Sequence, residues 1–125
     1  YDDPWQYVGR LSAEIWRAVR LVVDTGIHAK GWTREQAIAY FMENVPQGEI
    51  VATQEVERYI GVPGQALSYK IGEIKIRELR SRAEKALGRK FDIREFHDEI
   101  LTHGSVPLAV LEAAVDRWIA GKVRG

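Results

Sequence analysis

Residues 6–29 read "QYVGRLSAEIWRAVRLVVDTGIHA", and this stretch decides the fold class of the chain. Its apolar side chains recur at steps of three and four residues, which is the period of one face of an α-helix. The residues on this face are Val8, Leu11, Ile15, Val19, Val22 and Val23. Trp16, Ala18 and Ile27 widen the apolar face to roughly half of the helix circumference. A face of this width predicts that the helix contacts more than one neighbour.

Start and stop signals predict the position of the next two helices. Gly31 ends the first helix, because glycine readily adopts the left-handed conformation that terminates helices. Thr33 followed by Gln36 has the form of a capping box, and the helix that it starts ends before Pro46. Residues 50–61 then predict a short amphipathic helix, although its first residues are also compatible with an extended segment.

The second half of the chain shows the same helical period. The predicted helices cover residues 63–87, 93–103 and 106–120. Pro63 is expected in the first turn of the first of them, and Gly88 follows its end. Asp92 and Glu95 form a second capping-box pattern, and residues 121–125 are expected to fray. The sequence therefore predicts an all-α bundle of about five to six helices joined by short loops.

Composition narrows the class of protein. The 125 residues are 46% hydrophobic and 29% charged, as in ordinary soluble globular domains, and they can form one domain over residues 1–125. Lys and Arg number 18, as do Asp and Glu, and this balance argues against nucleic acid as a partner. The chain has no cysteine, which excludes disulfides and thiolate zinc sites and leaves the compartment undecided.

The termini and the apolar runs bear on location. No apolar run reaches the roughly 18 residues of a membrane-spanning helix, so no membrane-spanning segment is expected. The first residues lack the pattern of a signal peptide, and they also lack an initiator methionine. We therefore expect a soluble bacterial protein, cytoplasmic or exported, of which this chain is a fragment.

Three polar residues form a row in the first predicted helix. Arg20, Asp24 and His28 follow one another at four-residue steps, so their side chains stack along one stripe. Asp24 can pair with Arg20 and accept a proton from His28, which would fix the tautomer of the imidazole. Arg20 can instead clamp a substrate carboxylate. An ordinary solvated helix face with weak ion pairs explains the same spacing, and spacing alone favours that explanation.

A second candidate site lies in residues 63–72, "PGQALSYKIG". A Pro-Gly turn leads into a predicted helix start that carries Gln65 and Tyr69, and unpaired N–H groups at helix starts favour anions. A plain helix start with an amphipathic tyrosine at its rim is the alternative. His97 and His103 are six residues apart, a poor spacing for metal ligands, and we expect no metal site in the chain.

The strings "VVDTGIHAKGW" and "PGQALSYKIG" carry a family resemblance. Together with "FDIREFHDEILTHGSVPLAVLEAAVDRWI", they resemble the C-terminal region of the bacterial family known as domain of unknown function 885. Members of this family are several times longer and look like mostly helical zinc metallopeptidases of the HExxH type. The zinc motif lies upstream of the matched region and is absent here. The resemblance thus implies that the chain is the C-terminal half of a larger fold and is inactive alone.

The resemblance also implies roles for individual residues. His28 and Tyr69 would be catalytic donors to the substrate or to an oxyanion, with Asp24 orienting His28. Arg20 and Gln65 would bind the peptide substrate. Zinc is expected only in the full-length parent, which would be a peptidase-like hydrolase; some members of the family are linked to carboxypeptidase-like activity.

A second function, from a different class, also accounts for the wide apolar face of the first helix. The chain would then be a non-catalytic helical interaction domain. Its partner would be the upstream half of the same protein or a second copy of the chain, bound through the apolar face.

Overall fold

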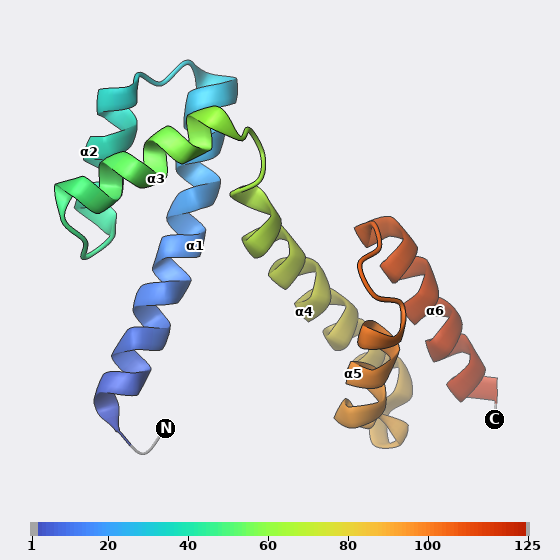
Figure 1. Ribbon diagram of the computed structural model, residues 1–125. Coiled ribbons are helices and arrows are strands. Elements are labelled where there is room, and N and C mark those ends of the chain that lie inside the picture. Colours follow the sequence, from blue (N-terminus) through green and yellow to red (C-terminus); the bar gives the residue numbers. More distant parts are fainter. Residues whose placement is uncertain (1–2, 125) are drawn as a thin grey trace. The chain divides into compact units, whose positions relative to one another are not determined.

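The computed structural model describes residues 3–124, and it confirms the predicted all-α architecture (Figure 1). The elements in chain order are α1 (Pro4–Lys30), α2 (Arg34–Asn44), α3 (Glu49–Gly61), α4 (Leu67–Leu87), the short 3₁₀ helix η1 (Gly88–Lys90), α5 (Ile93–Thr102) and α6 (Leu108–Arg124). No strand occurs in this described range. Among the same residues, no helix combines the length and the apolar character needed to cross a membrane.

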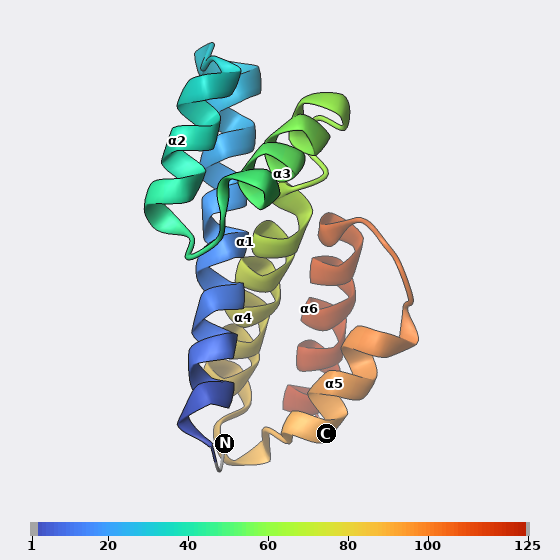
Figure 2. The same cartoon turned by 60° about the vertical axis from the view of Figure 1, so that its left-hand side comes forward.

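The chain divides into two compact units, Tyr1–Ile71 and Gly72–Gly125. In the first unit, α1, α2 and α3 contact one another, and the first half of α1 extends beyond the other two helices (Figure 2). The buried core of this unit comprises Val19, Val23, Ala37, Phe41, Val45, Ala52, Val56, Tyr59 and Ala66. In the second unit, α4, α5 and α6 share a core of Leu79, Ala83, Leu87, Phe96, Leu111, Val115 and Ile119. Each unit therefore buries an apolar cluster of its own.

Most of the predicted helix boundaries are confirmed. Gly31 ends α1 in the left-handed conformation with φ 68°, and both hydrogen bonds of the capping box join Thr33 and Gln36. The ambiguous start of α3 is helical from Glu49 onward. Asp92 caps α5 by accepting hydrogen bonds from the backbone N–H groups of Arg94 and Glu95.

Three predicted boundaries are wrong. The first helix begins at Pro4 rather than near residue 6, because the Asp3 carboxylate accepts from the Trp5 N–H and caps it. The helix predicted from Pro63 begins at Leu67, because Gly64 has φ 79° and interrupts the helical conformation. The fraying predicted after residue 120 is not found, since α6 continues to Arg124; residue 125 lies outside the described range.

Candidate functional site

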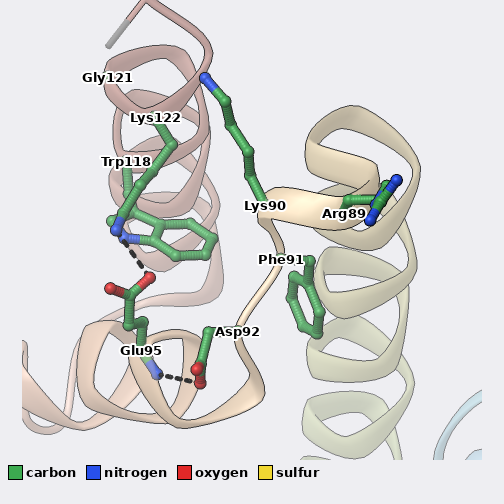
Figure 3. Close-up of a pocket in the computed structure, with 8 residues that line it drawn as sticks. All are labelled: Arg89, Lys90, Phe91, Asp92, Glu95, Trp118, Gly121 and Lys122. Carbon is green, nitrogen blue, oxygen red and sulfur yellow. Dashed lines mark hydrogen bonds and ion pairs between the residues drawn. The ribbon is translucent and has the colours of Figure 1, made fainter.

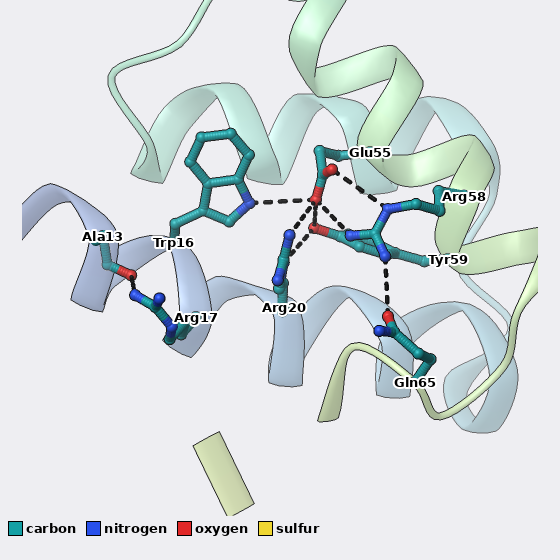
Figure 4. A network of polar contacts seen from close by, with 8 residues as sticks. All are labelled: Ala13, Trp16, Arg17, Arg20, Glu55, Arg58, Tyr59 and Gln65. Atoms are coloured by element: carbon teal, nitrogen blue, oxygen red, sulfur yellow. Dashed lines mark hydrogen bonds and ion pairs between the residues drawn. The ribbon is translucent and has the colours of Figure 1, made fainter. Parts of the chain in front are cut away.

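A carboxylate on α3 is the centre of the most connected polar cluster in the first unit (Figure 4). Glu55 Oε2 accepts hydrogen bonds from Arg20 Nη2 at 2.9 Å, Arg58 Nη2 at 2.9 Å and Trp16 Nε1 at 3.2 Å. The Tyr59 hydroxyl donates a short hydrogen bond to the same oxygen. Helices α1 and α3 are thus joined through one acceptor with four donors.

This cluster places Arg20 in a fixed position. Its Nε donates to the Tyr59 hydroxyl at 3.1 Å and its Nη2 donates to Glu55, and the side chain is only 16% exposed. The guanidinium carbon lies 5.1 Å from the centre of the Tyr69 ring, a distance typical of a cation–π contact. Nη1 has no hydrogen-bond partner among residues 3–124. Arg20 therefore keeps one donor group free for a ligand.

The protonation states of the cluster are fixed by the same contacts. Burial alone would raise the pKa of Glu55, but hydrogen bonds from Arg58, Tyr59 and Arg20 outweigh it and lower the pKa to about 2. Burial and the hydrogen bond to Glu55 raise the pKa of Tyr59 to about 12. At neutral pH the cluster therefore holds a carboxylate, a neutral phenol and a charged guanidinium.

The expected contact row of Arg20, Asp24 and His28 is not found among the described residues. Asp24 is 2% exposed, and its two carboxylate oxygens lie 3.2 and 3.1 Å from the backbone nitrogen of Gly64, which donates to them. His28 Nε2 lies 3.0 Å from the carbonyl oxygen of Tyr59, so this nitrogen is the donor. The physical reason is that buried backbone groups of α3 and of the following turn need partners, and α1 supplies them. Asp24 consequently does not orient His28.

The two strings that carry the family resemblance nevertheless meet in space. Asp24 of "VVDTGIH" accepts from the backbone N–H of Gly64 in "PGQALSY", and Arg20, two positions before the first string, lies against Tyr69 of the second. Gln65 joins the cluster through its side-chain oxygen, which accepts from Arg58 Nη1 at 2.8 Å. Tyr69 is 46% exposed, and its hydroxyl has no hydrogen-bond partner in the described part of the chain.

A close approach explains the glycine in this part of α1. A Cβ atom on Gly26 would lie 2.5 Å from the indole of Trp32, nearer than side-chain atoms pack. The backbone N–H of Trp32 donates to the Gly26 carbonyl at 2.9 Å, and this hydrogen bond helps to close the helix end before the chain turns into α2. Gly26 thus leaves room for the Trp32 indole where the chain turns after Lys30.

The surroundings of Arg20 include a small hollow. It has a volume of about 200 Å³ and is lined by Ala13, Trp16, Arg17 and Arg20. Arg17 is exposed and donates to the Ala13 carbonyl of its own helix at 2.9 Å. A carboxylate or a carbonyl oxygen of a ligand placed here would meet positive charge.

Sequence reasoning missed four members of this cluster: Trp16, Glu55, Arg58 and Tyr59. Within α3, the three- and four-residue spacing of the last three was a usable signal, because it places them on one face of the helix. Nothing in the sequence indicated that Glu55 and Arg20, 35 positions apart, are joined.

The other histidines lie in the second unit. His103 follows α5, and its Nε2 lies 2.9 Å from Glu99 Oε1. His97 lies near the ring of the buried Phe96. Across residues 3–124, no group of three or more His, Cys, Asp or Glu side chains is arranged to hold a metal ion. The described residues therefore offer no ligand set for zinc, which the resemblance assigns to residues upstream of this chain.

Comparison with known proteins identifies the family. The family described as "Bacterial protein of unknown function (DUF885)" matches residues 1–115. The chain belongs to this family. This chain is also similar to a solved structure, described as the crystal structure of the putative lipoprotein from Colwellia psychrerythraea. The two have 54% sequence identity and a TM-score of 0.94. The similarity covers 97% of this chain and 21% of that one, so the chain spans about a fifth of that protein's length. No curated protein matches the DUF885 chain.

Proposed function

We propose that this chain is the C-terminal, substrate-contacting part of a larger peptidase-like hydrolase of the zinc-dependent type. The observation that carries the proposal is the arrangement of Arg20 and Tyr69. The guanidinium is fixed by Glu55 and Tyr59, lies against the Tyr69 ring and keeps one nitrogen free. Such a pre-ordered pair of donors suits a substrate carbonyl or carboxylate.

The proposed roles use only side chains of this chain. The Tyr69 hydroxyl donates a hydrogen bond to a carbonyl oxygen of the peptide as negative charge develops on it. Arg20 Nη1 binds a substrate carboxylate beside the hollow at Trp16. Gln65 and Arg58 border the same region. Because Nε2 of His28 donates to the Tyr59 carbonyl, His28 can donate to a ligand only through Nδ1 of its imidazolium form. Any zinc ion would be held by residues outside this chain, as the greater length of the solved relative allows.

Activity measurements on a full-length protein that contains this chain test the proposal. Tyr69→Phe removes one hydroxyl and should lower kcat by about 100-fold with little change in KM. Arg20→Lys keeps the charge but loses the planar donor set, so it should raise KM. Tyr7→Phe, on the exposed first half of α1, is the matched control and should retain full activity. The proposal fails if both site variants hydrolyse peptides within about a factor of two of the wild type.

The solved relative is described as a putative lipoprotein. This description supports the proposal that the full-length protein is exported from the cytoplasm. Fractionation of bacteria that express the full-length protein would find it outside the cytoplasm if this is correct, and within it if not.

A non-catalytic interaction domain is the second candidate function, and the surface of α1 favours it. Trp5, Val8, Leu11 and Ile15 are large apolar residues with exposed fractions of 78%, 51%, 43% and 41%. Three of them also line a hollow of about 550 Å³. An exposed apolar strip of this kind is typical of a surface that binds another protein segment.

Light scattering on the 125-residue chain tests this candidate. Self-association that rises with concentration and is lost in Leu11→Glu would support it. Leu101→Glu, at a leucine of α5 that is 74% exposed, controls for the added charge. A chain that stays monomeric and binds no apolar dye would exclude it.

A further inference from the structure

A hollow in the second unit lies between η1, the start of α5 and the end of α6 (Figure 3). Its volume is about 870 Å³, within the range of small-molecule sites. The lining residues are Arg89, Lys90, Phe91, Asp92, Glu95, Trp118, Gly121 and Lys122. None of them belongs to the cluster around Glu55, so this hollow is independent of the proposed function.

Two aromatic rings give the hollow a rigid apolar wall. Phe91 and Trp118 are partly buried, and their ring centres lie 6.1 and 6.3 Å from that of Phe96. Phe96 is 1% exposed and belongs to the core of the unit. Because a core residue supports both rings, they can present fixed surfaces to a planar or apolar ligand.

The charges around the hollow leave cations in excess. Asp92 is engaged by the N–H groups of Arg94 and Glu95, at 2.7 and 3.4 Å. Glu95 accepts from Lys122 Nζ at 2.7 Å. With Arg89, Lys90 and Lys122 set against these two carboxylates, the lining carries one more cation than anions. Lys90 has no ion-pair partner among residues 3–124 and extends toward the end of α6 (Figure 3).

The same contacts select among anions. The first N–H groups of α5 are the donors that a phosphate would use, and the side chain of Asp92 already accepts from two of them. A doubly charged phosphate would also lie close to the carboxylates of Asp92 and Glu95. A single carboxylate needs only the ammonium of Lys90, and a planar body can lie on Trp118.

We propose that this hollow binds a singly charged carboxylate that carries an aromatic or other planar body, with Lys90 as the ion-pair partner and Trp118 as the apolar surface. Two sources supply this chemistry: a free aromatic acid, and the C-terminal aromatic residue of a peptide.

Titrations of the 125-residue chain followed by NMR test the proposal. The probes are 3-phenylpropionate for the free acid and N-acetyl-Gly-Phe for the peptide end. Each is paired with its neutral amide. At least one acid should shift the indole N–H signal of Trp118 with a Kd of about 1 mM or below, and its amide should bind about tenfold more weakly. The acid that binds more tightly identifies the source. The signals of Trp5, Trp16 and Trp32 should stay in place.

Variants connect the binding to named residues. Lys90→Gln should weaken the acid about tenfold, and Lys90→Arg should restore most of the affinity. Lys85→Gln, at an exposed lysine of α4 away from the hollow, should bind as the wild type does. The proposal is overturned if acid and amide bind equally, if Lys90→Gln has no effect, if neither acid binds, or if phenyl phosphate binds about tenfold more tightly than the acids.

Discussion

Each unit of the molecule gathers several charged side chains around one residue, but the two arrangements differ in burial. In the first unit Glu55 is the common partner, and its side chain and that of Arg20 are 17% and 16% exposed. In the second unit Arg82 binds Asp116, Glu78 and Glu112 at 2.6 to 3.0 Å, and the exposed fractions of these side chains range from 31% to 49%.

Burial changes what such a group of charges can do. Water competes for every contact around Arg82 and salt screens its ion pairs, although the hydrogen bonds that Arg82 donates to three carboxylates raise its pKa. Around Glu55, few water molecules can replace a lost partner, so each side chain keeps one orientation. The buried cluster can therefore position Arg20 against Tyr69, whereas the exposed one only links α4 to α6.

The largest effect is expected from Glu55→Gln. The amide keeps the shape but removes the charge that Arg20 and Arg58 share, so the free energy of unfolding should fall by about 2 to 3 kcal/mol. Urea denaturation measures this loss. Glu84→Gln, which removes an exposed partner of Arg80, is the control and should have almost no effect. Equal losses in the two variants would show that burial does not distinguish the clusters.

Acid provides a second test of the same cluster. The pKa of Glu55 is lowered from 4.5 in the unfolded chain to about 2 in the fold. A lowered carboxylate pKa contributes stability that is fully present above about pH 4.5 and is lost as the pH falls toward about 2. The difference in unfolding free energy between wild type and Glu55→Gln should therefore be constant above about pH 5 and shrink below it. A difference that stays constant down to about pH 3 would contradict the assigned pKa.

A smaller effect is expected when a single buried acceptor is weakened. Asp24→Asn leaves one oxygen to accept from the Gly64 N–H, so we expect a loss of about 1 to 1.5 kcal/mol. Asp92→Asn alters an exposed cap at the start of α5 and should cost less than about 0.5 kcal/mol, because asparagine caps helices almost as well. Thermal unfolding of both variants compares the two positions. A larger loss from Asp92→Asn would reverse the expected order.

The helices could be predicted from the sequence because their signals are local. The period of apolar residues in α1, the stop at Gly31 and the capping box at Thr33 each depend on residues within a few positions. The start of α4 was missed because a tertiary contact decides it. Gly64 adopts a positive φ, and its N–H is bound by a carboxylate 40 positions earlier in the chain.

The candidate site was predictable only in part, for the same reason. Helical spacing placed Arg20, Asp24 and His28 on one stripe of α1, but it does not specify which neighbour each side chain contacts. Their partners come from α3 and the turn after it, 31 to 40 positions away. The family resemblance made Arg20 and Tyr69 candidate site residues, yet the residue that positions Arg20 is Glu55, which no motif marked.

The smallest effect is expected at the centre of the exposed cluster. Arg82→Gln removes a side chain that contacts three carboxylates, so a count of ion pairs would predict a large loss. Because these contacts are open to water and salt, we expect Tm to fall by no more than about 3 °C at low salt. The difference should nearly vanish at about 1 M salt, where the screening length is only about 3 Å. Arg77→Gln, at an arginine 68% exposed and paired with Glu73, is the matched control. A drop in Tm that persists at high salt would mean that the exposed cluster is as rigid as the one around Glu55.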